Sequence, residues 1–196
     1  AAQPLSADLA LSWKDVLVPA DVAGQDLASV GQLTFKGSAE AYHAAGDVDI
    51  GPPGHVGKFT LDVDGKPDLI TLHTVQLKQP NGSLAASGTL TLQPQLAWKV
   101  DLKGERFDPS QLLAEWPGAL NLDLSTEGQL AKEGPLGTLD LRKLDGTLRQ
   151  RQLRGFGKLT LKPNEVVNGT LDLASGGSTV HLDAKGDTAN DANLKL

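Results

Sequence analysis

The chain has 196 residues, a formal net charge of −6, 39% hydrophobic and 21% charged residues, and no cysteine. This composition excludes intrinsic disorder, and the lack of cysteine excludes disulfides, thiol nucleophiles and cysteine-bound zinc. The negative charge argues against nucleic acid as a partner, and the absence of an apolar run of about 18 residues argues against a membrane span.

Alternation of apolar and polar residues dominates the chain. From Leu96 to Leu102 every second residue is large and apolar, which predicts a strand with one apolar and one polar face. The same alternation recurs at Phe59/Leu61/Val63, Val75/Leu77, Leu90/Leu92, Leu120/Leu122/Leu124, Leu139/Leu141, Leu159/Leu161, Leu171/Leu173 and Val180/Leu182. The sequence therefore predicts an all-β fold in which one side of the sheet is aliphatic throughout.

Short connections with turn chemistry predict antiparallel neighbours. We expect tight hairpin turns at Asp64-Gly65, Asn81-Gly82, Asp145-Gly146 and Asn168-Gly169, where glycine supplies a positive φ. The alternation changes phase between Leu72 and Val75, which predicts a β-bulge at His73 and Thr74.

A weak repeat, Gly-x-(Leu/Phe)-x-(Leu/Phe), begins at Gly31, Gly57, Gly88, Gly118, Gly137, Gly157 and Gly169. Its irregular spacing excludes a strict solenoid and favours hairpins of varying length stacked along one axis. Because the alternation reaches Leu196, we expect residues 1–196 to be one segment of a longer repeat protein.

One stretch departs from the strand pattern. Asp108 is a suitable N-cap, Pro109 suits the first helical position, and Pro117-Gly118 is a stop signal. We therefore predict a helix of about two turns over 108–116, with Leu112, Leu113 and Trp116 on one side. Such a short helix is marginal alone, so we expect it to close or line one part of the aliphatic face.

No catalytic constellation is visible. His43, His55, His73 and His181 lie in unrelated segments without metal-ligand spacing, and there is no nucleophile elbow or complete dinucleotide loop. We predict no enzyme, no metal site and no cofactor. The window from Arg142 to Lys162 holds seven basic residues and only Asp145 as an acid; it suits a solvated strand face or a surface for anionic headgroups or an acidic partner.

Two architectures are compatible with one aliphatic face. Two sheets could close on each other as a sandwich, which would make the leucines an ordinary core. Alternatively, one sheet curls without closing and leaves an apolar groove that requires an apolar ligand, most naturally a lipid. For that groove the predicted lining residues are Leu61, Val63, Leu90, Leu92, Leu96, Trp98, Val100, Leu102, Leu112, Leu113, Trp116, Leu120, Leu122, Leu124, Leu139, Leu141, Leu159, Leu161, Leu171 and Leu173.

The run from Phe107 to Asn121, FDPSQLLAEWPGALN, followed by Leu-Asp-Leu and the repeated strands, resembles the repeat region of the TamB family of AsmA-like proteins. The helix motif resembles it closely and residues from about Leu9 to Asp187 loosely. The resemblance implies a β-taco, which is an elongated curled antiparallel sheet with an aliphatic groove, in the periplasmic part of an inner-membrane-anchored protein of a Gram-negative bacterium.

The resemblance also implies partners. They are phospholipid acyl chains, a TamA-like outer-membrane protein contacted through a region outside this segment, and outer-membrane protein substrates such as autotransporters. Two other functions stay open at this point. One is a chaperone or scaffold that pairs its exposed strand edges with outer-membrane β-strands, and the other is a plain structural β-sandwich.

Overall fold

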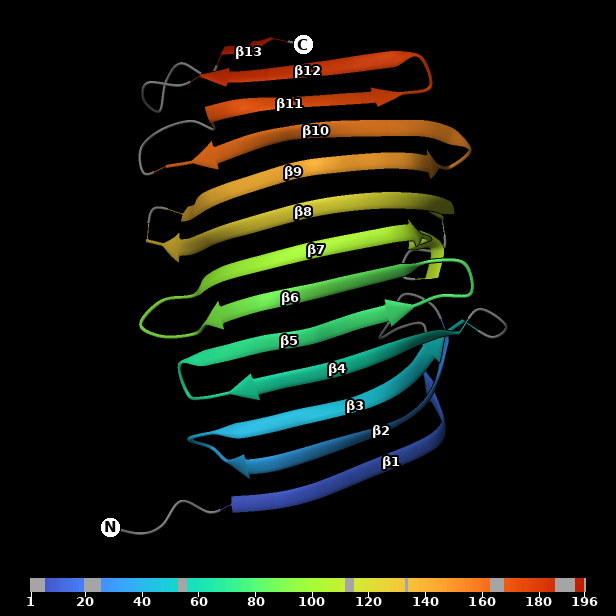
Figure 1. Ribbon diagram of the computed structural model, residues 1–196, viewed down its shortest axis with the longest axis vertical. Coiled ribbons are helices and arrows are strands. Elements are labelled where there is room, and N and C mark those ends of the chain that lie inside the picture. The colour runs from blue at the N-terminus through green and yellow to red at the C-terminus, as the bar shows by residue number, and fades with distance from the viewer. Residues whose placement is uncertain are drawn as a thin grey trace.

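The computed structural model describes residues 6–19, 26–52, 56–111, 115–132, 134–162, 168–185 and 193–195. Its 13 strands form one antiparallel sheet in which each strand lies beside its neighbours in sequence (Figure 1). With strands about 4.8 Å apart, the sheet extends about 58 Å from first to last strand. The strands are β1 (Ser6–Val18), β2 (Leu27–Ser38), β3 (Tyr42–Gly51), β4 (Gly57–Gly65), β5 (Leu69–Lys78), β6 (Ser83–Thr91), β7 (Ala97–Phe107), β8 (Gly118–Ala131), β9 (Gly134–Leu148), β10 (Arg151–Leu161), β11 (Asn168–Ser175), β12 (Ser178–Lys185) and β13 (Asn193–Lys195).

The sheet is open, and within the described residues no second layer covers it. No large side chain there is fully buried, and the buried apolar residues are Val63, Leu77, Phe107, Leu120 and Ala184. The chain exposes 12723 Å², whereas a compact protein of 20.5 kDa exposes about 8,900 Å². The structure therefore excludes the closed sandwich and confirms the predicted all-β, elongated, curled antiparallel sheet.

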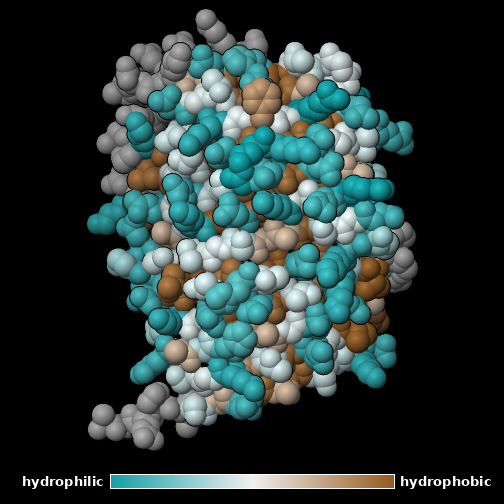
Figure 2. Space-filling model, viewed as in Figure 1, coloured by the Kyte–Doolittle hydropathy of each residue, from teal (hydrophilic) through white to brown (hydrophobic). Residues whose placement is uncertain are grey.

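Alternation sends apolar and polar side chains to opposite sides of the sheet. Residues paired across antiparallel strands point to the same side. One row of paired residues crosses nearly the whole sheet: Leu11, Leu33, Gly46, Leu61, Val75, Ala86, Leu102, Leu124, Leu141, Gly157, Leu171 and Leu182. We call this side the apolar face, and the other, which bears most charged side chains, the charged face. Figure 2 shows largely hydrophilic surface over the strands, with hydrophobic atoms between.

β-Bulges interrupt the pairing at several points. The β5–β6 register shifts at His73 and Thr74, which confirms the bulge predicted there. Further shifts lie in β1 and β7, where Asp15 has φ 53° and Arg106 has φ 47°. Because a bulge increases local right-handed twist, these positions help the sheet to coil.

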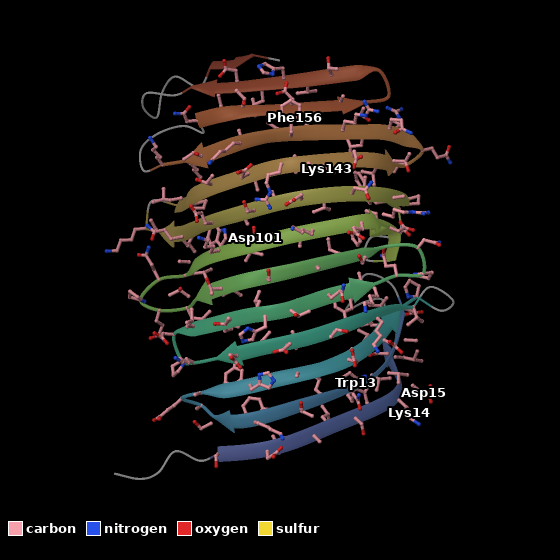
Figure 3. All side chains as sticks on the ribbon, in the orientation of Figure 1. Trp13, Lys14, Asp15, Asp101, Lys143 and Phe156 are labelled. Atoms are coloured by element: carbon pink, nitrogen blue, oxygen red, sulfur yellow. The ribbon has the colours of Figure 1, made fainter. Side chains whose placement is uncertain are left out.

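A bulge in β9 sets an aromatic ring on the charged face. Arg142 and Lys143 together oppose the single residue Phe156 of β10 (Figure 3). Phe156 is 60% exposed, although it is an aromatic residue. The paired position of Phe156 in β11 is Asp172, which confirms that its side chain points away from the apolar face.

Three of the four predicted turns are wrong. Asp145-Gly146 lies inside β9, Asn168-Gly169 begins β11, and Asp64-Gly65 ends β4, with the β4–β5 turn following at residues 66–69. Asn81-Gly82 lies in the β5–β6 turn as predicted, where the N–H of Gln79 donates to the carbonyl of Gly82 at 2.8 Å.

The reason for the error is that these glycines use positive φ within strands. Gly146 and Gly169 both have φ 135°, and a Cβ on either would collide with a carbonyl of the neighbouring strand. The left-handed turn positions fall elsewhere, at Arg149-Gln150 (φ 49° and 64°) and Gly176-Gly177 (φ 56° and 91°). The second pair lies in the turn between β11 and β12.

The two-turn helix predicted over 108–116 is wrong in the described residues. The β7–β8 connection contains one turn of 3₁₀ helix, Pro109–Gln111, and residues 115–117 are not helical. The predicted cap is nevertheless present, because Asp108 Oδ1 accepts hydrogen bonds from the backbone N–H groups of Ser110 and Gly118, each at 3.0 Å. One carboxylate therefore holds both ends of this connection without a longer helix.

Large side chains lie over glycines of the neighbouring strand on the apolar face. A Cβ added to Gly31 would lie 2.6 Å from Trp13 Cζ2, and one added to Gly155 would lie 2.6 Å from Leu173 Cδ2. The same holds for Gly128, whose Cβ would lie 2.6 Å from Trp98 Cζ2. These glycines let the larger residues pack flat against the backbone instead of standing off the sheet.

Candidate functional site

The candidate site is the apolar face. The predicted lining residues that lie within strands share this face: Leu61, Val63, Leu90, Trp98, Val100, Leu102, Leu120, Leu122, Leu124, Leu139, Leu141, Leu159, Leu161, Leu171 and Leu173. They fall in parallel rows that run across the strands, for example from Gly104 through Leu122, Leu144 and Gly155 to Leu173. The structure thus aligns these residues on one side of the sheet, although only residues of consecutive strands are direct neighbours.

The other predicted lining residues lie outside the strands. Leu92 and Leu96 are in the β6–β7 connection at a side edge of the sheet, 42% and 43% exposed. Trp116 is in the β7–β8 connection and is 42% exposed. Leu112 and Leu113 lie outside the described residues.

The apolar face also contains residues that the sequence reasoning did not select as lining. Trp13, Leu33, Leu84 and Leu144 belong to the same rows. Trp13 and Leu33 alternate with polar neighbours as the predicted lining residues do, so the period of two already indicated them. The alternation did not indicate Leu144 as a lining residue, because the β9 bulge shifts its phase relative to Leu141.

Among the leucines and valines of the apolar face, the most exposed lie on β1, because β1 pairs with a strand, β2, on one side. Leu9 and Leu11 on the apolar face are 59% and 61% exposed, whereas Val63 and Leu77, which lie between two strands, are 8% and 3% exposed. Aliphatic area on this face is therefore covered by flanking side chains of the same sheet, with no opposing layer among the described residues.

The charged face is tied together by cross-strand pairs. His43 Nδ1 lies 2.8 Å from Asp64 Oδ1, and His73 Nε2 lies 2.7 Å from Asp64 Oδ2. The hydrogen bond with His73, followed by that with His43, lowers the pKa of Asp64, and the same carboxylate raises the pKa of His73. One exposed carboxylate thus links β3, β4 and β5.

A second network centres on the β9 bulge. Arg142 donates from Nε to Asp123 Oδ1 and from Nη1 to Ser125 Oγ, each at 2.8 Å, and its Nη2 lies 3.6 Å from Asp101 Oδ1. The hydrogen bond from Arg142 lowers the pKa of Asp123, and that carboxylate raises the pKa of Arg142. These contacts join β7, β8 and β9 and account for part of the basic window as a solvated strand face.

Shallow hollows lie along the charged face. One of about 470 Å³ is lined by residues that include Lys14, Gln32, Asp47 and Lys58, and one of about 480 Å³ by Lys103, Arg106 and Asp123 among others. Most residues that line them are charged or polar, although the first hollow also reaches Trp13 and Val30, so the hollows do not correspond to the predicted aliphatic groove. Among the described residues, no three His, Cys, Asp or Glu side chains are grouped to hold a metal ion, and no helix is long and apolar enough to cross a bilayer.

The fold and the candidate site define a class of protein: an open, single-layer antiparallel β-sheet with one continuous aliphatic face and one charged face. The chain matches the family model described as TamB, N-terminal domain, over residues 1–196. It therefore belongs to the TamB family, as the resemblance of its Phe107–Asn121 stretch predicted. No curated protein and no solved structure matches the chain.

Proposed function

We propose that the apolar face is a track for phospholipid acyl chains and that this chain is a periplasmic segment of an inner-membrane-anchored bridge. The role is non-enzymatic and moves lipid between the inner and outer membranes. It also supports assembly of outer-membrane proteins, including autotransporters, together with a TamA-like partner contacted through another region of the protein. The single observation that carries this proposal is the continuous aliphatic face, which no opposing layer covers in the part of the chain that the structure describes.

A lipid needs such a surface because its chains are costly to expose to water. Each methylene costs about 0.8 kcal/mol, so a 16-carbon chain costs about 12 kcal/mol. Rows of leucine and valine offer surroundings close to hydrocarbon, and movement from bilayer to sheet is then nearly neutral in free energy. The headgroup stays in water beside the sheet.

The composition of the face suits sliding more than tight recognition. The chain contains only 4% aromatic residues, and the face is built mainly from leucine, valine, alanine and glycine, with a few aromatic residues such as Trp13 and Trp98. A selective pocket uses a few placed polar groups, whereas these rows present few. A lipid on them meets similar contacts from one strand to the next.

Photo-crosslinking tests the proposal directly. A photoreactive residue at Leu141, in the middle of a row, should capture phospholipid when the protein is expressed in Gram-negative cells. The matched control is Thr138, which lies on the same strand but on the charged face. Phospholipid at position 141 and none at 138 supports the track; no lipid at 141, with the variant folded, overturns it.

The edge-strand alternative uses a different surface. In this chain the exposed leucines Leu9 and Leu11 lie on β1, which pairs with β2 on one side. Leu122→Asp should block lipid transfer between vesicles but leave strand pairing intact, whereas Leu9→Pro should do the reverse. Ala85→Asp, on the charged face opposite Lys103, is the control for an added carboxylate.

A further inference from the structure

At the β9–β10 hairpin the apolar face reaches a side edge of the sheet, and basic residues follow the apolar ones there. Leu148 at the end of β9 pairs with Arg151 at the start of β10, and Leu153 follows on the same side. Because paired residues point to one side of the sheet, Arg151 stands at the end of the apolar face and not on the charged face. Between the strands, Arg149 occupies the turn with φ 49°, and its N–H donates to the carbonyl of Pro117 at 2.8 Å.

The two arginines at this corner lack the carboxylate partners that their neighbours have. Arg149 and Arg151 are exposed, and within the described part of the chain neither forms an ion pair with an acid. In contrast, Arg142 and Lys143 of the same basic window are paired with Asp123 and Asp145. The corner therefore holds two guanidinium groups whose hydrogen-bonding capacity is open to a ligand.

Neighbours on either side of the hairpin flank these arginines. The Arg149 guanidinium carbon lies 5.3 Å from the centroid of the Trp116 ring, a cation–π distance. The stem of Arg151 lies beside Gly176 of the β11–β12 turn. Figure 1 shows the β9–β10 and β11–β12 turns on the same side edge of the sheet. We call Arg149, Arg151 and Trp116 the arginine rim.

We propose that the arginine rim binds the anionic phosphodiester headgroup of a phospholipid whose acyl chains lie against Leu148 and Leu153. This inference rests on the proposed function and adds to it a residue pair that selects headgroup charge. Guanidinium groups bind phosphate oxygens through paired, charge-assisted hydrogen bonds. Tryptophan is favoured at the boundary between apolar and aqueous surroundings. A free anion or a nucleic acid would not contact the aliphatic side chains beside this corner, whereas the acyl chains of a phospholipid would.

Binding of fluorescent phospholipid to the purified chain tests the rim. The probes are phosphatidylglycerol and phosphatidylcholine with the same labelled acyl chain, and the variant is Arg149→Gln with Arg151→Gln. The control is Arg154→Gln with Lys158→Gln, which removes the same amount of charge from the charged face of β10. Circular dichroism checks that both variants stay folded.

We expect the rim variant to bind phosphatidylglycerol about fivefold more weakly, as for two exposed guanidinium–phosphate contacts, with phosphatidylcholine affinity nearly unchanged. The control variant should keep the affinity of the unaltered chain for both lipids. The preference for phosphatidylglycerol should also decline as salt is raised.

The outcomes separate the two proposals. If the unaltered chain binds neither lipid, the track and the rim both fail. If it binds both lipids and the rim variant behaves like the control variant, the rim fails and the track stands. If inorganic phosphate at millimolar concentration displaces the labelled lipid, the corner is a free-anion site and the headgroup assignment is overturned.

Discussion

The packing of Trp13 over Gly31 gives a sharp test of the apolar face. Trp13 Nε1 donates to Ser29 Oγ at 3.0 Å, and Ser29 is only 5% exposed. A Cβ on Gly31 would lie 2.6 Å from Trp13 Cζ2 and 2.9 Å from Cη2, so Gly31→Ala must displace the ring. Figure 3 marks Trp13 on β1.

The expected cost follows from three effects. Overpacking costs roughly 1–3 kcal/mol, and loss of a partner by the buried Ser29 hydroxyl costs roughly 1–3 kcal/mol. Replacing glycine by alanine within a strand returns roughly 0.5–1 kcal/mol. We therefore expect Gly31→Ala to destabilise the fold by about 3 kcal/mol, the middle of the range that these effects span, in urea unfolding followed by circular dichroism.

A double-mutant cycle isolates the ring as the cause. In a Trp13→Ala background the space over Gly31 is free, apart from the carbonyl of Asp47 at 3.1 Å, so Gly31→Ala should no longer destabilise the fold and should change stability by at most about 1 kcal/mol. Equal costs in both backgrounds would refute this packing and, with it, the account of how glycines keep the apolar face flat.

Three further outcomes are expected. Asp64→Asn should lower the raised pKa of His73 toward its ordinary 6.5, measured by NMR titration of the imidazole. Asp108→Ala should cost about 1 kcal/mol in urea unfolding, because two backbone N–H groups of the β7–β8 connection lose their acceptor. Leu77→Ala should cost about 2 kcal/mol and Leu9→Ala about 1 kcal/mol or less, because Leu77 is 3% and Leu9 is 59% exposed.

The pH dependence of the Asp64–His73 pair follows from the two shifts. The pKa of Asp64 is lowered from 3.8, so its contribution to stability is present above pH 3.8 and is lost as pH falls through the lowered value. The pKa of His73 is raised from 6.5, so its contribution is complete below pH 6.5 and is lost as pH rises through the raised value. The pair therefore contributes most between these limits, and an unchanged His73 titration in Asp64→Asn would contradict this assignment.

The remaining two predictions have their own controls. Glu115→Ala removes a carboxylate from the same connection without removing a cap, so it should leave stability nearly unchanged. An equal loss in Glu115→Ala and Asp108→Ala would contradict the capping role. A cost of about 4 kcal/mol or more for Leu77→Ala is typical of a closed core and would contradict an open single layer.

The sequence predicted the all-β class, the aliphatic face and the bulge at His73 and Thr74, because alternation with a period of two follows directly from strand geometry. It also predicted the Asp108 cap, since a carboxylate before proline is a local signal. It misassigned Asp145-Gly146 and Asn168-Gly169 as turns. Glycine permits positive φ equally in a turn and inside a strand, and only the neighbouring carbonyl decides between them.

Within the strand segments between bulges, the sequence alone thus determined which residues share a face. Whether that face would meet a second sheet or stay open was decided only by the tertiary structure, because the same alternation buries leucines in a sandwich and lines an open sheet. The Arg149 and Arg151 corner was likewise decided there, since the β9 bulge and the left-handed turn determine which side of the sheet each basic residue takes.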